Sequence, residues 1–192
     1  ILFLLCAAGA TCATSPAPQL VRPLDGAGQL VLVTVADWQA DTGILRRFER
    51  IDGRWSAVAE PYAVTVGRNG TAWGLGLQQP QIDGPQKHEG DGKAPAGVFA
   101  IGIAFGSPPA IDSGLRYRAM DASDWCIEVS GSSYYNRIIS TVDVGEDAVK
   151  GSTEPMRRDI HLDGDPLYRK GFIIGHNSGN SPGRGSCIFA HL

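Results

Sequence analysis

Glycine and proline interrupt this chain so often that little room is left for long helices. The 192 residues include 25 Gly and 12 Pro, and stretches with helical periodicity are scarce after the first dozen residues. A chain of this kind is built from short strands joined by tight turns. Its length suits one domain of ordinary size. We therefore predict a mostly β fold, a β-sandwich or partly open barrel with few short helices.

Apolar and β-branched runs predict about seven or eight short strands. The run at residues 30–35 is continuously apolar, so we expect a buried strand there. Asp52-Gly53 predicts the turn of a hairpin, and Asn69-Gly70 predicts a second tight turn. Further strands are expected over residues 62–66, 98–105, 115–120, 171–175 and 186–191, and a short helix over 146–150.

Two segments are predicted to be loops. Residues 74–95 are poor in apolar side chains, which predicts a long surface excursion, and long loops on small domains often carry function. Lys87, Glu89, Asp91 and Lys93 carry charges of both signs within it, a pattern typical of a solvated face. Residues 177–184 contain no apolar side chain and are expected to link the last two strands.

The first ten residues, ILFLLCAAGA, form an apolar run of the length of a signal-peptide core. The run is too short to span a bilayer, and the alternative is a buried N-terminal strand or helix. We expect a signal remnant and linker over 1–18, N-terminal strands over 19–58 and a catalytic domain over 59–192. The expected location is outside the cytoplasm, in the periplasm or cell envelope, with no transmembrane segment. The abrupt ends suggest a fragment at both termini.

Charge and ligand spacing exclude several classes of function. Lys and Arg total 17 against 20 for Asp and Glu, and the net charge is -3, so the basic footprint of a nucleic-acid binder is missing. The histidines and cysteines do not follow zinc-binding spacings, and we expect neither a metal nor a cofactor. The sequence carries no signal for an oligomeric state.

Cysteine and histidine together are the signal for a thiol nucleophile activated by an imidazole. Three pairings are open: Cys187 with His176, Cys187 with His191, and His191 with a cysteine beyond residue 192. The second places both side chains on one strand about 13 Å apart, too far for a hydrogen bond. Cys187 is otherwise a small buried residue, and one disulfide is possible.

Four segments, in order along the chain, resemble the catalytic domain of the L,D-transpeptidase (YkuD-type) family. Residues 87–99 read KHEGDGKAPAGVF and resemble a segment found in that domain. The other three segments are GRNGTAWG at 67–74, YNR at 135–137 and GSCIFAH at 185–191. The resemblance implies a β-rich domain that attacks peptidoglycan stem peptides with a cysteine and passes the acyl group to an amine or to water.

The resemblance also assigns roles to residues. His191 ends a strand where the family has its general base and acid, so the nucleophilic cysteine is expected beyond residue 192. His176, Asn177, Arg184 and Cys187 are expected to line the cleft, and Arg184 could hold a substrate carboxylate. Two alternatives are a non-catalytic peptidoglycan-binding or scaffold domain, and a thiol hydrolase that uses Cys187 with His176.

Overall fold

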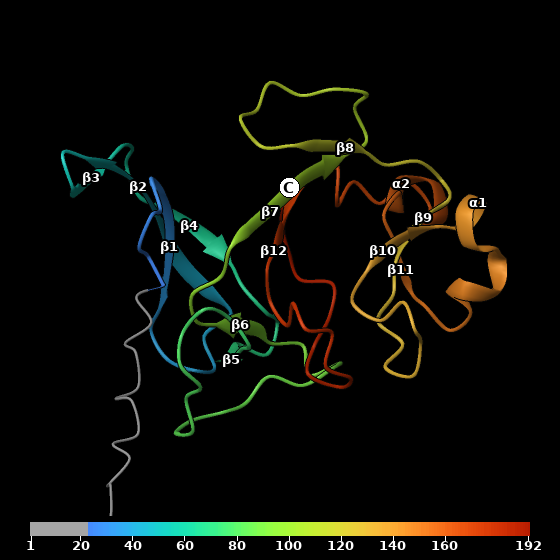
Figure 1. Ribbon diagram of the computed structural model, residues 1–192, viewed down its shortest axis with the longest axis horizontal. Coiled ribbons are helices and arrows are strands. Elements are labelled where there is room, and N and C mark those ends of the chain that lie inside the picture. The colour runs from blue at the N-terminus through green and yellow to red at the C-terminus, as the bar shows by residue number, and fades with distance from the viewer. Residues whose placement is uncertain (1–22) are drawn as a thin grey trace, which may run out of the picture.

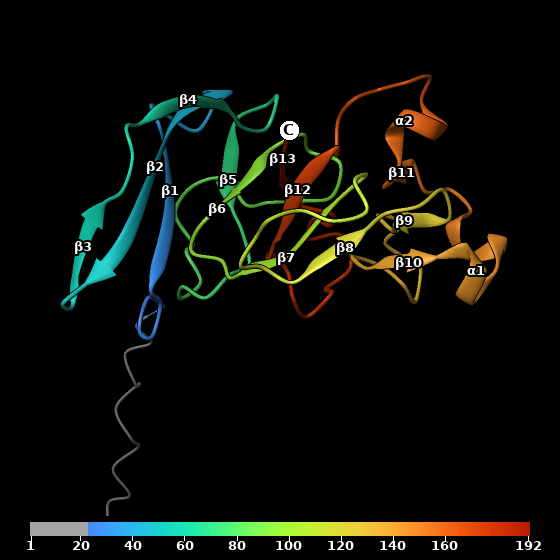
Figure 2. The ribbon, with the colours of Figure 1, turned by 90° about the horizontal axis from the view of Figure 1, so that it is seen from above.

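The computed structural model describes residues 23–192, so the expected signal remnant at 1–18 lies outside the described residues. Over this range the fold is mostly β, as predicted, with thirteen short strands and only two four-residue α-helices. The strands form four separate sheets, and no sheet in this range closes into a barrel. Figures 1 and 2 show the sheets following one another along the long axis of the molecule.

The first sheet contains strands β1 to β4 and lies at one end of the molecule (Figure 1). Its strands are β1 (Gln29–Val35), β2 (Thr42–Ile51), β3 (Arg54–Ala57) and β4 (Tyr62–Thr65). β2 pairs antiparallel with all three others. Asp52 and Gly53 connect β2 to β3 with φ angles of 49° and 77°, which confirms the predicted hairpin. Because β4 belongs to this sheet, the sheet extends past the boundary expected at residue 58.

Strand β1 exists as predicted, but the expectation that it is buried was wrong. Val31, Leu32 and Val33 are 37%, 39% and 40% exposed. Val31 and Val33 point to one face of the sheet and Leu32 to the other. A continuous apolar run identifies a strand, but its burial requires packing over both faces, and within residues 23–192 neither face is fully covered at these positions.

The central sheet has the order β13-β12-β7-β8 and carries the C-terminal end of the chain. Its strands are β7 (Ile101–Gly106), β8 (Tyr117–Ala119), β12 (Lys170–Ile174) and β13 (Phe189–His191). A short parallel pair, β5 (Thr71–Trp73) with β6 (Ala94–Ala96), lies between it and the first sheet (Figure 2). The strands predicted at 98–105, 115–120, 171–175 and 186–191 are thus confirmed, with shifted ends.

A small sheet with the order β10-β9-β11 lies at the other end of the molecule (Figure 1). Its elements and the helical turns beside it are β9 (Asp124–Cys126), β10 (Ile138–Ser140), α1 (Thr141–Val144), η1 (Glu146–Val149), β11 (Glu154–Pro155) and α2 (Arg158–His161). The helix predicted over 146–150 is the 3₁₀ turn η1. None of the helices within 23–192 has the length and apolar character needed to cross a bilayer.

The core lies where the central sheet meets the small sheet. Phe105, Met120, Cys126 and Met156 are almost completely buried, and Tyr168 and Phe189 pack against them among other apolar side chains. A disulfide between Cys126 and Cys187 joins β9 to the approach of β13. The two sheets are therefore held together by packing and by a covalent bond.

Candidate functional site

The loop that begins at residue 74 contains a partly buried carboxylate, Glu89, which accepts hydrogen bonds from two distant segments. The Glu89 carboxylate accepts hydrogen bonds from the Tyr135 hydroxyl and, at 2.7 Å, from the Ser186 hydroxyl. Tyr135 and Ser186 are both buried. Burial and the adjacent carboxylate raise the pKa of Tyr135 to about 12, so it remains a donor at neutral pH. We call Glu89, Tyr135 and Ser186 the Glu89 network.

The predicted solvated face of this loop was wrong for Lys87. Its side chain is only 5% exposed, and its Nζ lies 2.7 Å from an Asp91 carboxylate oxygen. The backbone N–H groups of His88 and Lys93 also donate to Asp91. These bonds hold the pKa of Asp91 below its usual range although burial opposes them. Two of these charges therefore form an ion pair within the loop, because the loop folds over Lys87.

Asn136 connects the next two segments with its side-chain amide. Its Oδ1 accepts the backbone N–H of Cys187 at 3.0 Å, and its Nδ2 donates to the carbonyl of Asn177 at 2.9 Å. Nδ2 also lies 3.3 Å from the carbonyl of His176. One side chain thus ties the segment around 136 to both ends of the 177–184 loop.

The segment at 67–74 joins the same arrangement through Asn69. Its Nδ2 donates to the carbonyl of Asp91 at 2.8 Å, and its backbone N–H donates to the carbonyl of Gly92 at 3.0 Å. Hydrogen bonds therefore connect four segments that lie far apart in the sequence, at 67–74, 87–99, 135–137 and 185–191.

The thiol hydrolase built on Cys187 and His176 is contradicted by the structure. The sulfur of Cys187 is bonded to that of Cys126, so no thiol is present at either residue. The His176 ring is 3% exposed, and its Nδ1 accepts the backbone N–H of Leu75 at 3.2 Å. Nε2 therefore carries the proton and donates to the Arg184 carbonyl at 2.9 Å. Mainly through burial, the pKa of His176 is lowered, and the neutral ring has no nitrogen left for catalysis.

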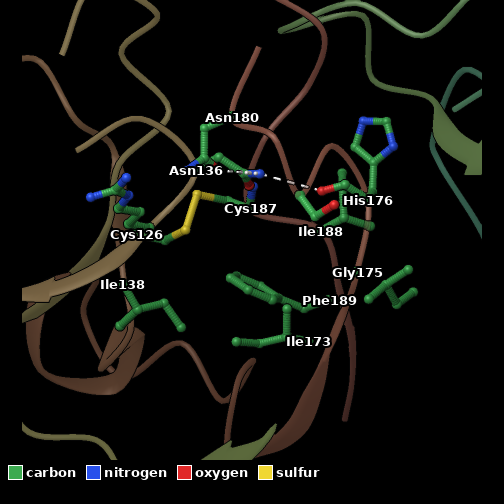
Figure 3. A pocket seen from close by; sticks show the side chains of 13 residues that line it. Cys126, Asn136, Ile138, Ile173, Gly175, His176, Asn180, Cys187, Ile188 and Phe189 are labelled. Carbon is green, nitrogen blue, oxygen red and sulfur yellow. Dashed lines mark hydrogen bonds between the residues drawn. A yellow bond between two sulfur atoms is a disulfide. The ribbon is translucent and has the colours of Figure 1, made fainter. Parts of the chain in front are cut away.

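A cavity of about 290 Å³ lies between the disulfide and the strands β10, β12 and β13. Figure 3 shows Ile138, Ile173 and Phe189 together on one side of it and the disulfide on another. Asn136 and Asn180 lie near the disulfide, while the ring of His176 points away. The cavity thus combines apolar side chains with amides.

Three residues that line this cavity, and Asn177 next to the lining residue His176, have left-handed backbone conformations. Asn136, Asn177, Asn180 and Cys187 have φ angles of 60°, 52°, 53° and 54°. Asparagine tolerates this region, whereas for cysteine it is uncommon. The disulfide and the bond from its N–H to Asn136 hold Cys187 there. Such conformations cluster at functional sites, which makes the cavity the candidate site.

The structure places only some of the expected cleft residues at the cavity. Cys187 and His176 line the cavity, whereas Asn177 and Arg184 are not among its lining residues. Asn177 is buried and braces the loop by donating to the carbonyls of Ser181 and Gly185. The arginine among the lining residues is Arg137, an exposed residue that sequence reasoning missed. The sequence signal that could have identified Arg137 is its place beside Asn136 in the segment at 135–137.

His191 lies at the end of β13, paired with Gly171, and its ring meets Tyr168 edge-on with centroids 4.8 Å apart. Tyr168 also contacts Phe189, at 5.4 Å. Because residues two apart on a strand share a face, Phe189 and His191 lie on the same side of β13, about 7 Å apart along it. Phe189 lines the cavity, so His191 is on the cavity side of the strand but not within it.

The charged residues near His191 have opposite effects on its pKa. Partial burial and Arg158 lower the pKa of His191, while Asp165 raises it. Arg158 is paired with Asp165, with 2.6 Å between guanidinium nitrogen and carboxylate oxygen, and lies over the Tyr168 ring. The net effect leaves the imidazole neutral at pH 7, the form that accepts a proton.

Within 23–192 no group of three or more His, Cys, Asp or Glu side chains has an arrangement that could hold a metal ion. No family model, no curated protein and no solved structure matches the chain. Functional inference therefore depends on the residues and on their geometry.

Proposed function

We propose that this chain belongs to a peptidoglycan L,D-transpeptidase-like enzyme that performs cysteine-dependent acyl transfer on the stem peptides of the cell wall. One observation carries the proposal. The four segments that resemble this family are linked to one another by the side chains of Asn69, Glu89 and Asn136. A chance resemblance of short segments gives no reason for all four to be joined by hydrogen bonds. Two of them, 135–137 and 185–191, also line the same cavity.

In this proposal His191 is the general base and acid. The neutral imidazole takes the proton of a cysteine thiol, and the thiolate attacks the carbonyl carbon of a stem-peptide amide. A thioester forms, the C–N bond breaks, and the imidazolium returns the proton to the leaving amine. An acceptor amine or water then attacks the thioester and restores the thiol.

The nucleophile is not among the described cysteines, because Cys126 and Cys187 are joined in the disulfide. The resemblance places it beyond residue 192. The disulfide supports the proposed location in the periplasm or cell envelope, since disulfides persist in oxidising compartments outside the cytoplasm.

The test uses protein translated from the entire coding region. It is incubated with a carbapenem, which acylates a reactive cysteine, and separately with a stem tetrapeptide, and intact mass is measured. We expect an adduct on one cysteine other than 126 and 187, and at least a 100-fold slower acylation in His191→Asn, the range of a lost general base. His88→Asn is the matched control, because this exposed ring makes no side-chain hydrogen bond within 23–192.

Two outcomes would refute the proposal. Acylation that proceeds equally fast in His191→Asn would show that His191 is not the general base. No adduct and no turnover in the wild type, together with binding of the stem peptide, would leave a binding domain without acyl-transfer chemistry.

A further inference from the structure

We infer that the cavity beside the disulfide binds a peptide residue that combines an apolar side chain with a free carboxylate. The side chain would lie against Ile138, Ile173 and Phe189, and the carboxylate would bind Arg137. That this residue is part of the acyl donor rests on the proposed function, whereas the binding itself does not.

The apolar part of the inference comes from the cavity wall. Ile138, Ile173 and Phe189 pack on the core cluster from one side and face the cavity from the other. Their exposed surface is available for an apolar group, whose transfer from water is favourable. Ligand pockets typically measure roughly 300–1,000 Å³. A cavity of about 290 Å³ therefore suits one or two residues of a peptide rather than a longer segment.

The charge of the cavity favours an anion. Arg137 lines it, and no acidic residue is among the lining residues. Within 23–192 the Arg137 guanidinium forms no ion pair. Its backbone is held by bonds to Ile127 and Tyr134, so the base of the side chain is fixed. A guanidinium without an acidic partner binds a carboxylate through two parallel hydrogen bonds.

The amides define where a peptide group would bind. Asn136 uses both ends of its amide within the protein, on the backbone of Cys187 and of Asn177. Asn180 accepts from Asn136 through Oδ1, and in the described part of the chain its Nδ2 has no acceptor. Asn180 is therefore the donor that remains for a ligand carbonyl.

The experiment is an NMR titration of the full chain with N-acetyl-leucine as the probe. Chemical-shift changes are expected at Ile138, Ile173 and Phe189. Arg137→Gln should weaken binding about tenfold or more, the usual range for a lost charge-assisted hydrogen bond. Arg116→Gln is the matched control, since this exposed arginine is not among the residues that line the cavity.

The inference fails if N-acetyl-leucine amide binds as tightly as the acid, because the carboxylate would then be irrelevant. It also fails if N-acetylglycine binds as tightly as N-acetyl-leucine, or if millimolar probe produces no shift at the cavity. Its failure is distinct from that of the proposed function. Probe binding without acylation would overturn only the proposed enzymatic function. Acylation without probe binding would overturn only the ligand proposed for the cavity.

Discussion

Glu89 and Ser186 are 97 residues apart in the chain, and their side chains are joined by a hydrogen bond of 2.7 Å. Tyr135 donates to the same carboxylate. One acidic side chain thus holds together the segment that begins at Lys87, the segment before β10 and the approach to β13. The Glu89 network thereby fixes Ser186, the residue directly before Cys187, which lines the cavity.

Replacing Glu89 with Gln should lower the free energy of unfolding by about 1–2 kcal/mol, because hydrogen bonds to a neutral acceptor are weaker than those to a charged one. Both hydroxyls donate to the same carboxylate oxygen, so the amide keeps an acceptor there but loses the negative charge. Chemical denaturation measures the change. Glu146→Gln is the control, because Glu146 is exposed on η1 and should change stability by no more than about 0.5 kcal/mol. Equal effects of the two substitutions would contradict a structural role for the Glu89 network.

Removing the disulfide should lower the stability of the folded protein by about 4 kcal/mol, the chain-entropy value for a closed loop of this length. Its two cysteines are separated by 61 positions in the sequence. The double variant Cys126→Ala with Cys187→Ala and the reduced wild type should show similar losses in guanidinium unfolding. If the reduced wild type is as stable as the oxidised protein, the bond does not contribute to the fold.

Substitutions on either side of His191 should move its pKa in opposite directions. Arg158→Gln removes a nearby positive charge and should raise the pKa, whereas Asp165→Asn removes a negative charge and should lower it. NMR titration of the ring protons, assigned with His191→Asn, measures both. Shifts of the same sign in the two variants would contradict the geometry around Tyr168.

Stability should decrease as the pH falls below about 6.5, the ordinary pKa of an unfolded histidine. The folded-state pKa values of His176 and His191 are both lowered, mainly by burial. The unfolded chain therefore binds more protons in this window, and its population increases on acidification. Unfolding free energies at a series of pH values measure the slope, which His191→Asn should reduce. A flat profile between about pH 7 and 5 would show that neither ring is held neutral.

Gly70→Ala should prevent stable folding. A Cβ at this position would lie 2.0 Å from the carbonyl oxygen of Trp38, and φ is +85°. Gly131→Ala is the control, because no atom lies within 4 Å of its would-be Cβ and its φ is not in the left-handed region. Circular dichroism and thermal unfolding compare the two. Trp38 lies in the connection between β1 and β2. A Gly70→Ala protein that unfolds at the same temperature as the wild type would contradict the close approach of Gly70 to this connection.

Local features of the fold were predictable because their causes lie within a few residues. Asp52-Gly53 and Asn69-Gly70 adopt turns for steric reasons that the neighbouring residues contain. Apolar, β-branched runs identified β1, β7 and β12 for the same reason. Burial was harder to predict from the sequence, as β1 shows. The same run of valine and leucine is buried or exposed depending on which other element packs on it.

The sequence by itself determined the mostly β class, the positions of the turns and the residue types available for chemistry. The tertiary structure decided their use. It paired Cys187 with Cys126, turned both nitrogens of His176 toward backbone groups, and placed Arg137 rather than Arg184 at the cavity. The physical reason is that turns depend on local backbone sterics, whereas these contacts join residues distant in the chain. They form only when two sheets pack and a long loop folds back between them.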